Sequence, residues 1–301
     1  MTLCAGDRTI FSYFLPFLVI SGQKNSVLPC ININGTISDR EGAGVPYDNG
    51  AFRYGYGLFE TMLVRDGAIQ LVEYHMDRLF SGMAQLHMAL LPSLTPAALA
   101  AAVLATARYN GLQHFCRVRL QVFPKHGRVY SPGPLESGYI MECLEINEAD
   151  TRWNNDGLSI GIAPGVVKST DVLSNLKCCN SMVYAVAAQW ARANDLDDAL
   201  ICNAGGNVVE SSIANIFWVR NGTVFTPPLS EGCVAGVMRK YILAQMPEIV
   251  EKDCSPDDLT DADEIFLTNA IRRIRWVGRM GDKVYGNKIT GELIAQKLFA
   301  E

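Results

Sequence analysis

The sequence predicts an α/β protein of two domains, and three observations lead to that prediction. The chain has 301 residues, more than a single hydrophobic core usually organises. Short apolar runs closed by Asn-Gly or Asp-Gly turns alternate with segments whose apolar residues recur every three or four positions, as in strand hairpins and helices. An acidic, irregular stretch then separates two halves. We therefore expect a small α/β domain at 31–146, a linker at 147–156 and a larger domain at 157–301.

Residues 1–30 form an extension whose role the sequence leaves open. Its apolar run Ile10–Ile20 is shorter than the roughly 20 residues of a membrane-spanning helix, and Pro16 interrupts it. The basic start and small-residue cleavage site of a signal peptide are not evident. The run is either a tail from an upstream start codon or a segment that packs on the body. We favour the first, because the recognisable pattern of elements begins only near Ile31.

Composition narrows the class of partner and the compartment. The net charge is −5, from 26 basic and 31 acidic residues without a basic run, so nucleic acid is not an expected partner. The nine cysteines are odd in number, contain no CxxC pair and include the adjacent Cys178 and Cys179. This usage is typical of a reducing cytoplasm rather than of a disulfide scaffold or a zinc site. We expect a cytoplasmic protein with no metal and no membrane association.

The first half is expected to hold short strands and two helices. Helix Val72–Leu86 follows from Met76, Leu79 and Met83 on one face, and Pro92–Tyr109 is an alanine-rich helix. The expected strands and hairpins are Cys30–Ile33, Thr36–Ser38, Met62–Leu71 turning at Asp66-Gly67, Arg117–Phe123 and Gly138–Leu144.

The second half continues the alternation. Expected helices are Asn180–Arg192, Gly236–Gln245 and a closing helix Ile289–Phe299. Expected strands are Leu158–Ile162, Ala199–Cys202, a strand from Val208, Asn215–Arg220, Thr223–Thr226 and Glu264–Leu267. Charges that we expect to be solvated or at an interface are Arg272, Arg273 and Arg275.

One lysine and one glutamate in this half carry a chemical hypothesis. Lys177 is expected at the entrance of helix Asn180–Arg192, beside N–H groups that no carbonyl satisfies. A cation is disfavoured at that end, so its amine should lose a proton more readily than an ordinary lysine. Glu210 is expected where a sheet bends. Taken singly, such charges are usually solvated surface groups.

The spacing around these two residues resembles a known family. The segment reads LK-x-x-N, then a hairpin, then E-x-x-x-x-N-I-F, with 33 residues from Lys177 to Glu210. It is similar to the fold-type IV pyridoxal-phosphate enzymes, which include branched-chain and D-amino-acid aminotransferases and 4-amino-4-deoxychorismate lyase. The resemblance implies a barrel-like sheet in the larger domain, a homodimer, and pyridoxal 5′-phosphate. It also implies that Lys177 forms the Schiff base and that Glu210 pairs with the ring nitrogen.

The same resemblance implies the remaining site residues. The pattern H-x-x-R-L at 75–79 looks like the phosphate-binding arginine, which would be Arg78, although an exposed polar helix face would read the same. Further phosphate contacts would come from Gly236, Val237, Met238, Thr268 and Asn269. Substrate contacts would come from Tyr54, Phe59 and Arg128, the last within a G-R-x-Y-S loop where a solvated arginine is equally expected.

Three positions look like the lyase branch of the family. Met182 stands where branched-chain aminotransferases tend to have tyrosine, Gly236–Arg239 looks like the lyase's Gly-Ile-Met-Arg, and Asn269 precedes alanine as in lyases. Tyr56 is a departure, because aspartate is common there. The resemblance implies conversion of 4-amino-4-deoxychorismate to 4-aminobenzoate and pyruvate, within folate biosynthesis. The alternatives are an amino-acid aminotransferase and a cofactor-free binding or scaffold relative.

Overall fold

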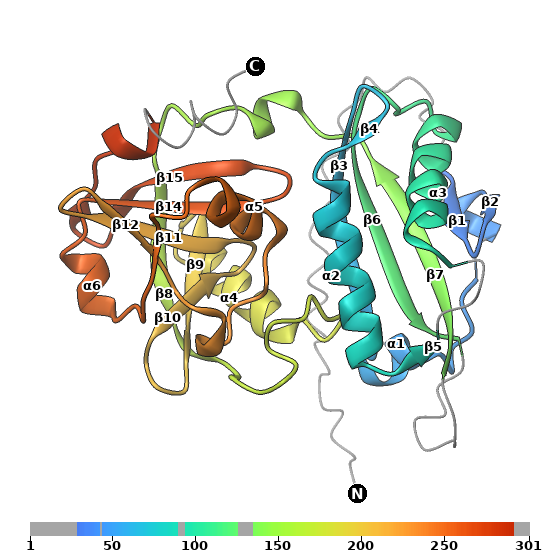
Figure 1. Ribbon diagram of the computed structural model, residues 1–301, viewed down its shortest axis with the longest axis horizontal. Helices are drawn as coiled ribbons and strands as arrows, with labels where there is room; N and C mark the ends of the chain where they lie inside the picture. The colour runs from blue at the N-terminus through green and yellow to red at the C-terminus, as the bar shows by residue number, and fades with distance from the viewer. Residues whose placement is uncertain (1–28, 43, 90–93, 126–134, 292–301) are drawn as a thin grey trace, which may run out of the picture.

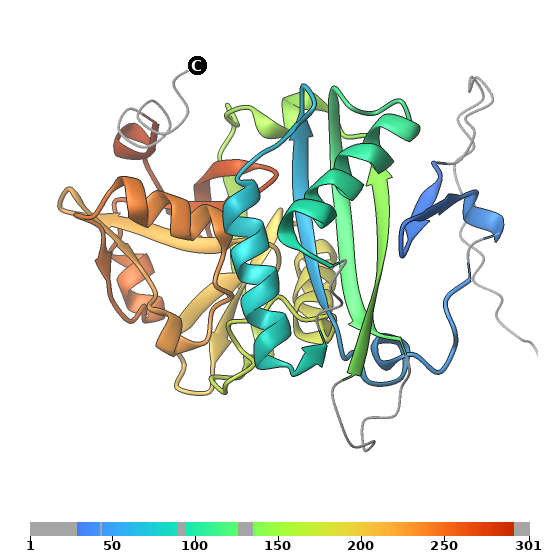
Figure 2. The ribbon, with the colours of Figure 1, turned by 45° about the vertical axis from the view of Figure 1, so that its right-hand side comes forward.

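The computed structural model describes residues 29–42, 44–89, 94–125 and 135–291. Almost all of the extension 1–30 and the loop that carries Arg128 lie outside these residues, as does most of the predicted closing helix. The described chain forms two sheets that lie side by side (Figures 1 and 2). None of the helices in this part of the chain is long and apolar enough to cross a membrane.

The N-terminal sheet contains seven strands in the order β2-β1-β7-β6-β3-β4, with β5 beside β7. Apolar and polar residues alternate along its long central strands, so one face is buried. Helices α2 (Val72–Gln85) and α3 (Pro96–Tyr109) cover that face, and α1 (Gly50–Tyr54) lies at one end. The strands are β1 (Ile31–Ile33), β2 (Thr36–Ser38), β3 (Leu58–Arg65), β4 (Ala68–Ile69), β5 (Met88–Ala89), β6 (Phe115–Pro124) and β7 (Leu135–Leu144).

The C-terminal sheet closes on itself. Strand β10 pairs with both β9 and β11, so six strands form a ring in the order β8-β9-β10-β11-β14-β15. This confirms the expected barrel-like sheet. Helices α4 (Met182–Ala193), α5 (Val237–Gln245) and α6 (Pro256–Thr260) lie around it. The strands are β8 (Leu158–Lys168), β9 (Asp198–Asn203), β10 (Val208–Ser211), β11 (Asn215–Arg220), β12 (Thr223–Thr226), β13 (Val250–Glu251), β14 (Glu264–Asn269), β15 (Arg273–Met280) and β16 (Lys283–Val284).

Two of the strands that differ from the sequence prediction are β8 and β15. β8 was expected to end at Ile162 but continues to Lys168, because the register shifts after Ile162 and Gly165 adopts a φ of +70°, which hides the alternation. β15 was not predicted, since its charged residues resemble a surface loop. Arg275 in this strand is buried, and its guanidinium donates to the backbone carbonyls of Asp150 and Arg152. The prediction of a solvated or interface charge was therefore wrong for Arg275.

The segment around Lys177 joins the two sheets. The N–H of Phe59 in β3 donates to the carbonyl of Lys177 at 3.0 Å, and the N–H of Cys179 donates to the carbonyl of Gly57 at 2.8 Å. Leu58 and Cys178 form an isolated antiparallel bridge between these bonds. The lysine thus follows the C-terminal strand β8 in sequence but is hydrogen-bonded to the edge of the N-terminal sheet.

Candidate active site

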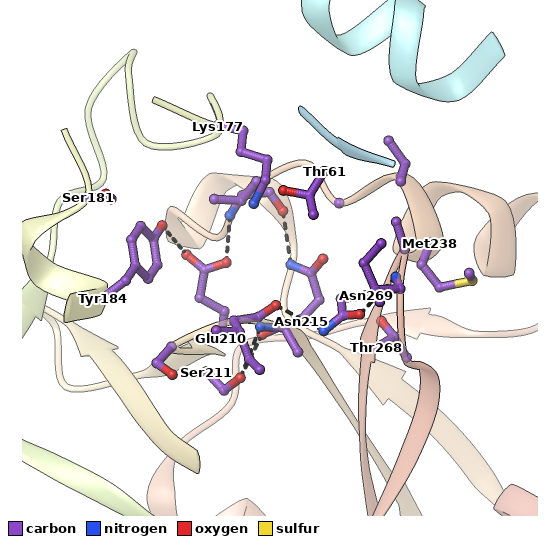
Figure 3. Close-up of a pocket in the computed structure, with 18 of the residues that line it drawn as sticks. Thr61, Lys177, Ser181, Tyr184, Glu210, Ser211, Asn215, Met238, Thr268 and Asn269 are labelled. Carbon is purple, nitrogen blue, oxygen red and sulfur yellow. Dashed lines mark hydrogen bonds between the residues drawn. The ribbon is translucent and has the colours of Figure 1, made fainter. Parts of the chain in front are cut away.

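A pocket of about 490 Å³ lies between the two sheets and contains most of the predicted site residues (Figure 3). Its walls come from β3 and β6 on one side and from the barrel strands and the start of α5 on the other. The predicted site residues in its lining are Phe59, Arg78, Lys177, Glu210, Gly236, Val237, Met238, Thr268 and Asn269. Chain segments more than 200 residues apart in sequence therefore meet at one cavity.

Lys177 enters this pocket next to the Phe59 ring, whose centroid lies 4.3 Å from Nζ. Burial and the charge of Arg78 lower the pKa of Lys177 to about 8, against the opposing effects of Glu60 and Glu210. The expected direction is confirmed, but the expected cause is wrong. Helix α4 begins only at Met182, and the backbone at Lys177 is bonded to β3, so burial and Arg78 replace the helix end as the cause.

The lowered pKa predicts a distinct pH profile for imine formation at Lys177. Only the neutral amine attacks an aldehyde, so labelling by a small aromatic aldehyde and borohydride should rise through pH 8 and then level off. An ordinary lysine, with a pKa of about 10.4, should still be gaining reactivity at pH 9 to 10. Peptide mapping by mass spectrometry measures the labelling of Lys177 and of an ordinary lysine in one sample, with exposed Lys252 as the internal control. Parallel profiles for the two lysines would contradict the prediction.

Glu210 lies on β10 next to a shift in strand register, which confirms the expected irregularity of the sheet there. Its carboxylate is buried and accepts from the Tyr184 hydroxyl at 2.7 Å and from the Val234 N–H at 3.0 Å. Lys168 Nζ lies 3.7 Å from Oε1. Burial raises the pKa of Glu210, whereas the Lys168 charge and the two hydrogen bonds act in the opposite direction. Neither Lys168 nor Tyr184 was among the site residues predicted from the sequence.

Arg78 is held from two sides. Its Nε and Nη2 donate to the two carboxylate oxygens of Glu60 at 2.8 and 2.6 Å, and Nη1 donates to the carbonyl of Ala235 at 3.1 Å. His75 Nδ1 lies 2.6 Å from the same carboxylate and is fully buried. The alternative of an exposed polar face is therefore wrong. Burial tends to raise the pKa of Glu60, but Arg78 and His75 outweigh it and bring the pKa to about 2.

The start of α5 forms a site that suits an anion. As the first helical residues, Val237 and Met238 have N–H groups without a carbonyl partner in the helix. A Cβ added to Gly236 would lie 1.8 Å from Asn215 Oδ1, so only glycine fits without a shift. Thr268 Oγ1 is buried nearby and has no hydrogen-bond partner among the described residues. Free donors, a close backbone approach and an unpaired hydroxyl fit the phosphate of the expected cofactor.

The Asn269 side chain stabilises the turn in which it lies. Its Oδ1 accepts from the N–H groups of Ile271 and Arg272, and its Nδ2 donates to the carbonyl of Ile213. These bonds hold the turn between β14 and β15, which lines the pocket. Its predicted contact with phosphate stays a prediction. Arg272 is exposed and lies at this turn, where its side chain borders the pocket.

The wall formed by β6 carries two arginines that the sequence analysis did not select. Arg117 and Arg119 alternate along the strand and both line the pocket, a spacing that was visible in the sequence. Arg119 Cζ lies 3.9 Å from the centroid of the Phe59 ring, and Arg117 Nε is buried without a partner among the described residues. Tyr54 is half exposed at the end of α1 and does not line the pocket. Arg128 lies outside the described residues.

Comparisons with known proteins agree on the family. The model of the amino-transferase class IV family matches residues 57–279. A putative branched-chain-amino-acid aminotransferase of Methanocaldococcus jannaschii is 29% identical over 87% of this chain and 92% of its own. An aminodeoxychorismate lyase of Vibrio harveyi is 26% identical over 75% and 84%. The crystal structure of 4-amino-4-deoxychorismate lyase from Pseudomonas aeruginosa superposes with a TM-score of 0.72 at 25% identity, covering 87% of this chain and 99% of that one.

Proposed function

Because this chain belongs to the amino-transferase class IV family, we propose that it is a lyase that converts 4-amino-4-deoxychorismate to 4-aminobenzoate and pyruvate. Pyridoxal 5′-phosphate is the cofactor of the family. The observation that carries the choice of substrate is the pair Arg117 and Arg119 in the pocket wall. The proposed substrate carries two carboxylates, and guanidinium groups are well suited to bind carboxylates. A branched-chain amino acid carries only one.

The residues of the pocket divide into a cofactor side and a substrate side. Arg78, the N–H groups of Val237 and Met238, and the hydroxyl of Thr268 would hold the phosphate, and Glu210 would face the ring nitrogen. When bound, the cofactor supplies an electron sink for the pair left behind when a bond at the substrate's amine-bearing carbon breaks.

The protein's own groups then move the protons. The Lys177 amine, with its pKa near 8, can take the proton from the carbon that bears the amine and then, as a general acid, give it to the departing enolpyruvate, which becomes pyruvate. Glu210 would hold a proton at the ring nitrogen. Arg117 and Arg119 would fix the two carboxylates, which orients the carbon–oxygen bond that breaks as pyruvate leaves. The ring becomes aromatic in the product, which supplies much of the driving force.

The reaction without an acceptor tests this proposal. The purified holoenzyme, given 4-amino-4-deoxychorismate and no keto acid, should release pyruvate and 4-aminobenzoate in equal amounts over many turnovers. A lactate dehydrogenase assay follows the pyruvate and chromatography follows the 4-aminobenzoate. Failure to form pyruvate, combined with transfer of the substrate's amino group to added keto acids, would overturn the lyase assignment.

The second candidate is an amino-acid aminotransferase of the branched-chain or D-amino-acid type. It is favoured by the 29% identity with the putative branched-chain enzyme of M. jannaschii over nearly the whole chain. In that case, ordinary amino acids should convert the bound cofactor to its pyridoxamine form, which absorbance spectra detect. The lyase proposal expects this conversion to be slow compared with pyruvate release.

We also propose that the protein acts as a cytoplasmic homodimer. The eight cysteines in the described ranges are all free thiols, in keeping with a reducing compartment. Large apolar side chains are exposed near α1, before Lys177 and on α4, and a second copy of the chain would cover them. These side chains are Tyr47, Phe52, Tyr54, Val172, Leu173, Met182 and Val186.

A further inference from the structure

Lys168 is a buried cation that the proposed reaction does not use. It ends strand β8, and its side chain is only 7% exposed. Two backbone carbonyls fix its ammonium group, that of Ser174 at 2.5 Å and that of Gly232 at 2.6 Å. Within the described part of the chain, the ammonium group pairs with Glu210, whose Oε1 lies 3.7 Å from Nζ. A cation held this firmly beside a buried carboxylate acts on the ionisation of that carboxylate.

Other groups around Glu210 come from separate elements. Tyr184 on α4 donates its hydroxyl, Lys177 approaches from the segment before α4, and the backbone N–H of Val234 precedes α5. The thiol of Cys233 also lies within electrostatic reach. Burial favours the neutral acid, and the charge of Lys168 is the largest effect that opposes it. The other donors are neutral or have smaller effects.

We propose that Lys168 is a positioning residue that keeps Glu210 ionised, so that Glu210 can hold a proton on the ring nitrogen of the cofactor. This inference rests on the proposed function only in that it requires bound pyridoxal 5′-phosphate, whichever reaction follows. Without Lys168, the proton shared by Glu210 and the ring nitrogen should move to the carboxylate. The ring would then be neutral and a weaker electron sink.

A purely structural role is the competing explanation. Lys168 joins the loop at Ser174 to the loop at Gly232, so its removal could loosen the pocket without changing any ionisation. The two roles differ in one respect. If Lys168 is purely structural, its removal should weaken cofactor binding equally with or without the Glu210 carboxylate. If it acts through the charge of Glu210, its removal should have little effect once that carboxylate is replaced.

The first measurement reads the proton on the ring directly. Full-length protein is loaded with pyridoxal 5′-phosphate labelled with ¹⁵N in the ring, and the nitrogen chemical shift reports protonation. The wild type should show a protonated nitrogen at neutral pH, Lys168→Met a mainly unprotonated one, and Lys168→Arg should restore the wild-type shift at least in part. A protonated ring in Lys168→Met, with the same shift as in the wild type, would overturn the inference.

The second measurement is a double-mutant cycle on cofactor binding. Lys168→Met should weaken binding of pyridoxal 5′-phosphate by at least about tenfold in the wild-type background, and by less than about twofold in Glu210→Gln. Equal losses of cofactor affinity in both backgrounds would mean that Lys168 has only a structural role. Lys252→Met, which removes a half-exposed lysine bonded to Asp258, should bind normally.

Three further outcomes are distinguishable. If Lys168→Met does not fold, Lys168→Gln, which can still donate to one carbonyl, takes its place in both measurements. If the wild type itself fails to bind pyridoxal 5′-phosphate, the proposed function fails. If the wild type binds it and the variants match the wild type, the inference about Lys168 alone fails.

Discussion

Replacing Lys177 with alanine is expected to lower kcat/KM by at least about 1,000-fold and to abolish the imine absorbance of the bound cofactor. The side chain is the amine in the pocket whose pKa, near 8, suits both attack on an aldehyde and proton transfer at neutral pH. Alanine removes both tasks and leaves the start of α5 and Arg78 untouched. Steady-state kinetics and a visible spectrum of the purified variant measure the two effects.

A lysine outside the pocket provides the control for this experiment. Lys240 lies on α5, is largely exposed and pairs with Asp77. Lys240→Ala should keep the absorbance and change kcat/KM by less than about threefold, since exposed ion pairs contribute little. Retention of the imine band in Lys177→Ala would show that another amine holds the cofactor, and would remove the basis of the assignment.

Replacing Glu60 with glutamine should lower the free energy of unfolding by about 3 to 5 kcal/mol and weaken cofactor binding. The substitution keeps the size of the side chain but leaves the Arg78 guanidinium, only 12% exposed, without its counter-charge. Arg78 is also the group that links α2 to Ala235, next to the anion site at α5. Urea denaturation gives the stability change, and a titration with pyridoxal 5′-phosphate gives the change in binding.

The pH dependence of stability separates this charge from a packing effect. The pKa of Glu60 is lowered to about 2, so its contribution is complete above the unfolded value near 4.5 and is lost as pH falls towards 2. The stability difference between wild type and Glu60→Gln should therefore shrink below pH 4. Asp261→Asn, at an exposed pair with Arg220, should change stability by less than about 0.5 kcal/mol. A difference that stays constant down to pH 2 would contradict the proposed charge effect.

Local pattern was enough to predict the elements that carry the cofactor side of the site. Glu210 stands near the end of β10 and Gly236 at the start of α5, where turns and apolar spacing mark the element ends in the sequence. Lys177 was expected at a helix entrance, but it lies five residues before α4, on a segment bonded to β3. The hairpin Asn215–Arg220 and Thr223–Thr226 was predicted with its observed ends, because the Asn-Gly turn sets its register. The closed ring of strands came from the family resemblance and not from periodicity.

Two of the residues that were missed, Glu60 and Lys168, act through distant partners. Glu60 meets Arg78 and His75 only because α2 packs along β3, and nothing in the segment around Glu60 marks it as buried. Lys168 was missed because β8 continues through a shift of register that the strand pattern does not reveal. Such pairings depend on tertiary packing, which a single sequence does not display.

Because Leu58 pairs with Cys178, the position of the reactive amine depends on strand β3, which lies more than a hundred residues earlier in the chain. A chimera that took residues 157–301 from this protein and its first half from a distant relative would inherit the lysine and the glutamate. The two side chains would keep their relative positions only if the corresponding strand of the relative could form the same backbone hydrogen bonds. Exchange of halves between such enzymes is therefore constrained by main-chain pairing at the junction as well as by the choice of side chains in the pocket.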